Sequence, residues 1–397
     1  MVRSQGVRRG RGALGASALA CAAALAACTP SIAPGTQVGA DPFTTPVVPT
    51  GGDAQSGSGQ GVPQSGGLDA PTPRRGHGNI VVAHPEGREL PAALVDGFTS
   101  ATGFTLTQVS VPTVQWEKGN LGGNAADVLV DLDETELLAA TASGTVGATA
   151  PEDASTPAGT GIDGAAAGIA YGRDDVCVLA DTQWYAANRR SDPPTTLADL
   201  TRADVASLLT VPDPATTVEG RAFVQLIGAS TGKSAAATMT SLLRAGAATV
   251  DEGGASAAWT ATASAGSPSG ATAASGARPL LVARASTIAA SETNTGTEAA
   301  GRALGATCLK RDVFAAIDAD ATRRDGAESL VAYLLGRSAQ GALAAAGTVH
   351  PLDAGAAAGT AAQWFLTPAK DAVSLPVADV AKTTDWLAAW RAATTTR

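Results

Sequence analysis

The fold class is decided by the stretch Ile80-Val81-Val82-Ala83, a short apolar run that predicts a buried strand. Residues 91–102 follow, with proline at the first turn and apolar residues on one face, and predict a helix that ends at Gly103. Residues 104–111 alternate between apolar and polar and predict a second strand. A strand, a helix and a strand in succession are typical of an α/β fold with a mainly parallel sheet.

The same mixture of short strands and helices continues towards the carboxyl terminus. We expect strands at 127–130, 168–180, 279–283 and 304–309, and helices at 134–142, 197–209, 218–227, 234–245 and 325–345. Residues 252–278 hold too few large apolar side chains for an assignment. Because about 320 folded residues exceed a comfortable single core, we expect two lobes.

The amino terminus carries the pattern of a secretory signal. Four arginines precede an apolar run at 13–24, and Leu25-Ala26-Ala27-Cys28 follows. The run is too short for a membrane helix, which needs roughly 20 apolar residues. The last four residues resemble the lipobox of bacterial lipoproteins, which implies that residues 1–27 are removed and Cys28 is lipidated. A second candidate, ending at Cys21, lacks the branched residue three positions before the cysteine.

Residues 28–78 are mostly Pro, Gly, Ser, Thr and Gln, so they bury too little apolar surface to offset their ordering entropy. We expect a disordered tether that holds the folded residues 79–397 roughly 40 Å from the membrane. This places the folded part outside the cytoplasm and anchors it to the cell membrane by lipid.

The charge balance limits the partners. The whole chain has 27 Lys and Arg against 36 Asp and Glu, a net charge of −9, and residues 1–27 contribute arginine but no acid. Such an acidic surface argues against nucleic acid, whose phosphates require basic patches. It does not attract anionic membrane either, so the lipid has to provide the anchor.

Two cysteines remain after the signal is removed, Cys177 and Cys308. Outside the cytoplasm such a pair is a disulfide candidate, and two buried free thiols are the alternative.

Several segments together resemble an extracytoplasmic solute-binding protein of an ABC importer, in the branch that binds thiamine, iron and related solutes. The matching segments are 98–103, 126–128, 171–178, 194–200, 212–220, 278–282, 308–317 and 334–340. The resemblance implies an α/β, two-lobed periplasmic-binding-protein-like fold of type 2 with hinge strands between the lobes. The expected first lobe is 79–175 with 308–325, and the second is 180–305 with 326–397.

The same resemblance implies a monomer that captures a small polar solute and delivers it to an ABC permease in the membrane. A thiamine-like solute is expected first and a small anion second. It also puts Cys177 and Cys308 near the two crossing strands, which favours the disulfide. Neither a cofactor nor a metal is expected, because no cluster has metal-ligand spacing.

Ligands of such folds bind at the carboxyl ends of strands and at helix amino termini. We therefore expect binding residues in the turn with His84 and Glu86, at Asp133 after the third strand, and at Thr216 and Thr217. Thr216 and the glutamate at 219 match a capping box. The alternatives are a solvated turn for the first pair and a plain helix cap for Thr216.

Three aromatic residues could stack on a ring-bearing solute, namely Trp116, Tyr171 and Trp259, although core packing is the alternative for each. Arg284 and Ser286 occupy the place of the Tyr-Ala-Ser step in the thiamine and iron branch. If Arg284 faces the cleft, it would repel a thiazolium and favour an anion, whereas the alternative is a solvated arginine. The tyrosines 171, 185 and 333 are not adjacent, which argues against iron.

Two rival functions compete with solute binding. Gly228-Ala229-Ser230-Thr231-Gly232 matches the nucleophile elbow of serine hydrolases, but the segment before it predicts a helix rather than the required strand. A surface interaction module that has lost its ligand is the third class. We expect binding without catalysis, and no catalytic residue is assigned.

Overall fold

The computed structural model describes residues 71–147, 154, 157–187, 192–251, 253–255, 257, 259, 278–291 and 294–396. The expected signal segment, Cys28 and nearly all of the expected tether lie outside these residues. Within the described part, no helix combines the length and the apolar character that crossing a bilayer requires.

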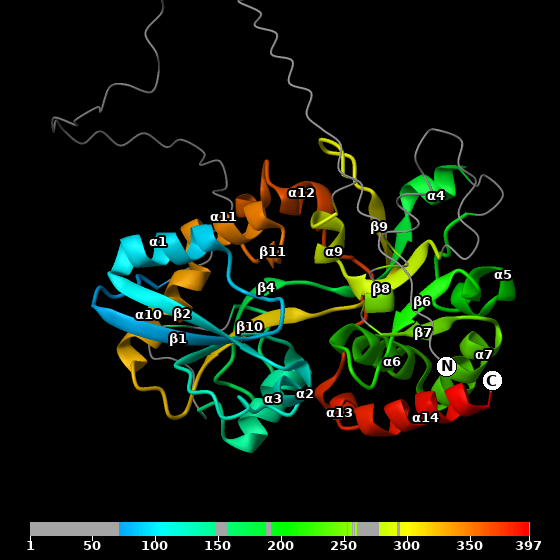
Figure 1. Cartoon of the computed structure of the whole chain (residues 1–397), viewed down its shortest axis with the longest axis horizontal. Coiled ribbons are helices and arrows are strands. Elements are labelled where there is room, and N and C mark those ends of the chain that lie inside the picture. The colour runs from blue at the N-terminus through cyan, green and yellow to red at the C-terminus, as the bar shows by residue number, and fades with distance from the viewer. Residues whose placement is uncertain are drawn as a thin grey trace, which may run out of the picture. The chain divides into compact units, whose positions relative to one another are not determined.

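The first lobe is built on a six-stranded sheet with the order β11-β4-β10-β3-β1-β2 (Figure 1). β1 pairs with β2 and β3 in parallel, whereas β10 runs antiparallel to β3 and β4. The strands are β1 (Gly78–Pro85), β2 (Phe104–Val111), β3 (Val128–Leu132), β4 (Ile169–Arg173), β10 (Asp312–Ile317) and β11 (His350–Pro351). The helices are α1 (Ala92–Thr102), α2 (Thr113–Trp116), α3 (Glu134–Ser143), α10 (Arg324–Leu335) and α11 (Arg337–Ala346).

Alternate side chains of these strands enter two apolar cores, one on each face of the sheet. Ile80 and Val82 pack with Phe98 of α1 and with residues of α10 and α11. Ala83 and Leu129 pack with Leu137 of α3 on the opposite face. Strands that are buried on both faces explain the continuous apolar runs in the sequence.

The second lobe is built on a five-stranded sheet with the order β7-β6-β8-β5-β9. Its strands are β5 (Val176–Asp181), β6 (Leu209–Pro212), β7 (Ala248–Val250), β8 (Leu280–Arg284) and β9 (Gly301–Leu309). Its helices include α4 (Thr182–Ala187), α5 (Ala203–Ala206), α6 (Val218–Thr231), α7 (Ala235–Arg244) and α9 (Ser286–Ala289). Three carboxyl-terminal helices follow, α12 (Ala361–Phe365), α13 (Val377–Val380) and α14 (Thr383–Thr395).

Two short crossing segments connect strands of the two lobes, from β4 to β5 and from β9 to β10, and a longer segment between β11 and α14 later returns to the second lobe. The two short segments run side by side, because the backbone N–H of Asp174 donates to the carbonyl oxygen of Arg311 at 2.9 Å. Cys177 and Cys308 are register partners on β5 and β9, and a disulfide joins them. The sequence places these cysteines 131 positions apart, so this bond ties together strands that only the tertiary fold makes neighbours.

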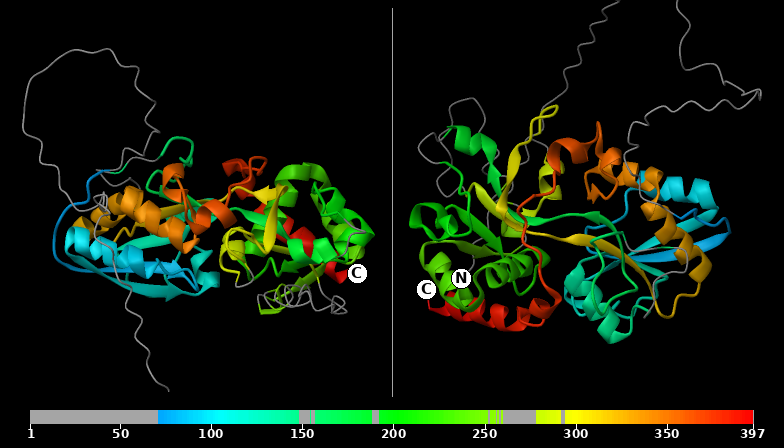
Figure 2. Two further views of the ribbon diagram at one scale, coloured as in Figure 1. Left: turned by 90° about the horizontal axis from the view of Figure 1, so that it is seen from above. Right: turned by 180° about the vertical axis from the view of Figure 1, so that it is seen from behind.

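The expected lobe boundaries need a correction after residue 325. The expected helix at 325–345 is interrupted at Gly336, and both halves pack on the first lobe, where Leu330 and Leu343 share a core with Ile80. Only the last helices return to the second lobe: Trp386 and Trp390 of α14 enter its core (Figure 2, red). Residues 324–351 therefore belong to the first lobe.

Two expected elements also differ locally. The span 168–180 is two strands, β4 and β5, because Asp174 and Asp175 form the crossing between them. The expected helix at 197–209 is a short 3-10 turn at Asp199–Thr201 followed by α5 and the start of β6. Its apolar residues fill the core of the second lobe without a continuous helix.

The motif at 228–232 begins inside α6 rather than on a turn after a strand. A Cβ on Gly228 would lie 2.2 Å from the Trp386 ring, so the close approach of α14 accounts for this glycine. Ser230 is exposed on the last turn of α6. The geometry differs from the strained strand-to-helix turn that a nucleophile elbow requires.

Candidate functional site

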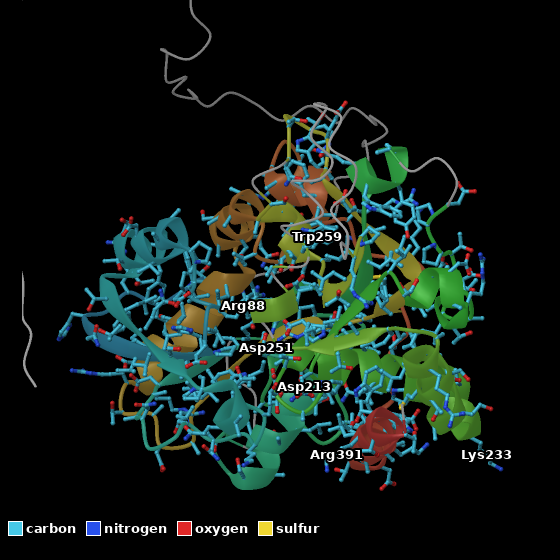
Figure 3. The ribbon with its side chains drawn as sticks, turned by 45° about the vertical axis from the view of Figure 1, so that its right-hand side comes forward. Arg88, Asp213, Lys233, Asp251, Trp259 and Arg391 are labelled. Atoms are coloured by element: carbon cyan, nitrogen blue, oxygen red, sulfur yellow. A yellow bond between two sulfur atoms is a disulfide. The ribbon has the colours of Figure 1, made fainter. Side chains whose placement is uncertain are left out.

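A cavity of about 400 Å³ lies where residues of both lobes meet. The first lobe contributes the turn after β1, and the second contributes the amino terminus of α6 and the end of β8. Figure 3 shows Arg88 of that turn where the ribbons of the two lobes come together. The lining includes Glu86, Arg88, Thr113, Thr216, Thr217, Glu219, Arg284, Ser286, Thr287 and Thr348. Carboxyl ends of parallel strands and helix amino termini are the usual ligand-binding positions of such sheets.

Asp131 lies behind this cavity and receives arginines from both lobes. Arg88 donates through Nε and Nη2 to its two carboxylate oxygens at 3.1 and 3.2 Å. Arg284 of the second lobe donates through Nη1 to Oδ2 at 3.0 Å. Arg311, on the crossing segment, donates to the backbone carbonyl oxygen of Asp131 at 3.0 Å. Asp131 has a φ of 62°, the left-handed backbone region that Asp and Asn tolerate better than most residues.

Each of these two cavity-lining arginines has a second acidic partner. Arg88 Nη2 also donates to Asp174 Oδ2 at 3.0 Å, and Arg284 Nε donates to Glu219 Oε1 at 2.7 Å. Asp174 is fully buried and also accepts from Ser286, through the backbone N–H at 2.9 Å and Oγ at 2.7 Å. We call Arg88, Asp131, Asp174, Glu219 and Arg284 the Arg284 cluster.

The surrounding charges keep Asp131 and Arg284 ionised. Burial alone would raise the pKa of Asp131, but Arg88, Arg284 and Arg311 lower it, and the pKa lies well below its usual range. Burial opposes the charge of Arg284, but Asp131 and Glu219 outweigh it and raise its pKa well above the ordinary value. The Asp131 carboxylate and the Arg284 guanidinium are therefore charged at any physiological pH.

A second set of ion pairs joins the lobes away from the cavity lining. Arg221 of α6 forms an ion pair with Glu117 at 2.7 Å and donates to Glu136 at 3.1 Å and to Asp133 at 3.4 Å, and all three acids belong to the first lobe. Burial, followed by the charge of Asp133, raises the pKa of Glu136 to about 7. Next to it, burial and the charges of Asp133 and Asp312 raise the pKa of Glu134 to about 8. We call Glu117, Asp133, Glu136 and Arg221 the Arg221 cluster.

Comparison with known proteins supplies the family. The family model of bacterial extracellular solute-binding proteins matches residues 80–349, a span that contains both crossing segments and the whole cavity lining. The chain belongs to this family. No relative is found among curated proteins.

Solved structures share the fold of this solute-binding protein at low sequence identity. A periplasmic thiamin-binding protein is 17% identical with a TM-score of 0.61, over 81% of this chain and 98% of its own. The apo ferric ion-binding protein A of Pasteurella haemolytica is 14% identical with a TM-score of 0.62, over 80% and 98%. A Trichodesmium protein in complex with iron and citrate is 15% identical with a TM-score of 0.61, over 79% and 99%. The two-lobed α/β architecture of type 2 periplasmic binding proteins is thereby shown.

Half of the residues expected from the sequence to bind solute line the cavity of this solute-binding protein. They are Glu86, Thr216, Thr217, Arg284 and Ser286. The helix cap differs from the expected capping box by one position: Thr217, not Thr216, accepts from the backbone N–H of Gly220, at 3.2 Å. Thr216 is thus free of the capping role.

The other expected residues lie elsewhere. His84 is buried, with Nδ1 2.8 Å from the Pro85 carbonyl oxygen, so it is not in a solvated turn. Asp133 caps α3 and belongs to the Arg221 cluster. The hydroxyl of Tyr171 accepts from the backbone N–H of Asp131 at 3.2 Å. Trp116 and Trp259 pack in apolar cores, Trp259 next to the disulfide.

Sequence reasoning missed Arg88, Asp131, Asp174 and Glu219 as a connected set. Asp131 and Arg284 are separated by 153 positions and Arg88 and Asp174 by 86, so no local pattern couples them. The only available signal was position, because each residue stands next to a segment where a strand ends or a helix begins. Among the described residues, no group of three or more His, Cys, Asp or Glu is arranged to hold a metal ion.

Proposed function

We propose that this protein is the lipid-anchored receptor of an ABC import system, which captures a small polar solute and delivers it to a membrane permease. The observation that carries the proposal is the cavity lined by both lobes, since a solute held there contacts both halves at once. Binding that favours the closed arrangement of two lobes is a population shift between open and closed forms.

The anchor is supported by the sequence. A basic and apolar segment leads to Cys28, and a stretch rich in Pro, Gly and Ser separates that cysteine from β1, which begins at Gly78. A lipidated Cys28 would leave the folded part tethered outside the cytoplasm.

The lining indicates how the solute is bound. Among the residues that the structure describes, six hydroxyl side chains and four charged side chains line the cavity, and none of the lining residues is Trp, Tyr or Phe. Hydrogen bonds and charge, rather than ring stacking, would therefore hold the solute. Thiamine is the first compound to test, because one structural neighbour is a periplasmic thiamin-binding protein. An iron site built on tyrosines has less support, since Tyr171 lies behind the lining and is hydrogen-bonded to Asp131.

The test is a thermal-shift panel on the mature protein with vitamins, amines, amino acids and phosphate esters. A solute that binds the folded protein raises Tm. At a free concentration of about 100 times Kd it adds roughly 2.7 kcal/mol to the unfolding free energy. Calorimetry then compares two matched variants: Ser286→Ala should weaken binding about tenfold, and Ser230→Ala should leave it unchanged. A panel without any shift would favour the interaction module, and ester turnover abolished by Ser230→Ala would favour the hydrolase.

A further inference from the structure

We propose that Asp131 sets the charge selectivity of the cavity: it neutralises Arg88 and Arg284, so that the cavity rejects small oxyanions and admits solutes that carry an ammonium group. This inference rests on the proposed function, because it concerns the solute of the same site. It goes further in naming the charge class and the residue that determines it.

The first step is the geometry of Asp131. Its carboxylate lies between an arginine of the first lobe and an arginine of the second, within 3.0–3.2 Å of both, and its side chain is 4% exposed. Two converging guanidinium groups around one carboxylate are the arrangement that proteins use to bind an external oxyanion. Here the protein's own carboxylate occupies that position.

Second, both arginines that line the cavity already have their full set of carboxylate partners. Arg88 contacts Asp131 and Asp174, and Arg284 contacts Asp131 and Glu219, so each guanidinium already has two carboxylate partners. An incoming phosphate or sulfate would have to compete with Asp131 for both guanidinium groups and would leave this buried carboxylate with Arg311, at 3.5 Å, as its remaining ion-pair partner. Breaking buried ion pairs in this way is strongly unfavourable. The cavity is therefore a poor site for a free anion, although two arginines line it.

The third step is the surplus of negative charge. Three guanidinium groups lie in or behind the cavity lining, those of Arg88, Arg284 and Arg311. Four carboxylates lie there with them, those of Glu86, Asp131, Asp174 and Glu219. In the neighbouring Arg221 cluster three acids surround Arg221, and Arg311 lies 3.7 Å from two of them, Asp133 and Glu136. The whole chain has a net charge of −9. A concave site with excess carboxylate concentrates cations.

This reverses what Arg284 suggests in the sequence. An arginine in place of an aromatic residue predicts repulsion of a cationic ring and a preference for anions, and Arg284 does line the cavity. Its charge, however, is taken up by Asp131 at 3.0 Å and Glu219 at 2.7 Å. The electrostatic potential in the cavity therefore depends on all charges of the Arg284 cluster and not on Arg284 alone.

Asp131→Asn tests the proposal directly. Asparagine keeps the size and tolerates the left-handed backbone at φ 62°, while the charge that neutralises the arginines is removed. Calorimetry with inorganic phosphate and with sulfate should detect no binding to the wild-type protein and at least a tenfold gain in affinity for the variant. Asp96→Asn, which removes the same charge from an exposed position on α1, should gain nothing.

Either of two results would overturn the proposal: oxyanions that bind the wild-type protein as tightly as the variant, or a folded Asp131→Asn protein that gains no oxyanion affinity. If Asp131→Asn fails to fold, Glu219→Gln releases Arg284 on its other side and should give a smaller gain, and its absence would count equally against the proposal. The measurement needs no knowledge of the natural solute.

The thermal-shift panel provides the second arm. The compound that stabilises the wild-type protein most should carry an ammonium group and should lose at least tenfold in affinity in Asp131→Asn. A best compound that is an oxyanion would refute the charge assignment and leave the receptor function standing. A panel with no binder would count against the receptor function, while the phosphate titration would still decide the role of Asp131.

Discussion

The Arg284 cluster and the Arg221 cluster use the same chemistry in different surroundings. In each, an arginine of the second lobe pairs with at least one carboxylate of the first, Arg221 at 2.7–3.4 Å and Arg284 at 3.0 Å. Arg284 and Glu219 border the cavity, whereas the members of the Arg221 cluster are absent from its lining. An ion pair can therefore contribute to solute binding only where it borders an open cavity. We therefore expect the Arg284 cluster to govern solute affinity and the Arg221 cluster to govern the association of the lobes.

The largest expected effect separates the clusters through stability. Arg221→Ala would leave Glu117 without its cation and would leave Asp133 and Glu136 with only the more distant Arg311, which should cost about 3–5 kcal/mol of unfolding free energy. Urea denaturation measures this loss. The exposed Arg244→Ala on α7 is the matched control and should change stability by no more than about 0.5 kcal/mol. Equal losses of unfolding free energy in both variants would show that the ion pairs of Arg221 do not stabilise the protein.

The next effect distinguishes the clusters by pH. Glu134 and Glu136, beside and within the Arg221 cluster, have folded pKa values raised from about 4.5 to about 8 and about 7. Their contribution to stability is fully present below pH 4.5 and is lost as pH rises through 7 and 8, a decline on the order of a few kcal/mol. Asp131, whose pKa is lowered, does not titrate in this window.

Denaturation curves at pH 4.5, 6 and 8 measure this dependence. Glu134→Gln, which is neutral at every pH, should flatten the decline. Stability that increases over the window, or a decline that the variant leaves unchanged, would contradict the assignment.

A smaller loss is expected from the disulfide, which lies outside both clusters. The double variant Cys177→Ser with Cys308→Ser should lose about 2–4 kcal/mol. Solute affinity should stay within about twofold, because neither sulfur lines the cavity. Reduction of the wild-type protein should reproduce the loss, and a large fall in affinity would extend the site to the crossing strands.

The smallest effect concerns the helix that carries residues of both clusters. Thr217→Ala removes the cap of α6 and should cost about 1 kcal/mol, whereas Thr216→Ala, one position earlier, should cost at most a few tenths. Thermal unfolding of the two variants measures the difference. Equal costs would return the capping role to Thr216, as the sequence pattern suggests.

Local patterns in the sequence were sufficient for much of the fold. The run at Ile80, the one-sided helix that ends at Gly103 and the helix expected at 134–142 all depend on neighbours within a few positions, and the structure has β1, α1 and α3 there. The segment 197–209 was assigned wrongly, because apolar residues of a buried strand start and of short turns mimic helical spacing. Here tertiary burial outweighs local propensity.

Less of the candidate site could be predicted from the sequence. Positions next to strand ends could be named, and Arg284, Ser286 and Glu86 do line the cavity. The carboxylate that neutralises Arg88 and Arg284 depends on pairing across 43 and 153 positions and on the unusual backbone of Asp131. Neither leaves a periodic signal in a single chain.

The path of the polypeptide between the lobes has a consequence for how such a receptor can diversify. Neither half is encoded by one continuous stretch, since the chain completes the first sheet with β10 and β11 and only then packs α14 against Phe223 of the second. Recombination that exchanged one half for that of another receptor would need several simultaneous breakpoints. Substitution of single residues around the cavity requires no breakpoint and leaves both sheets intact.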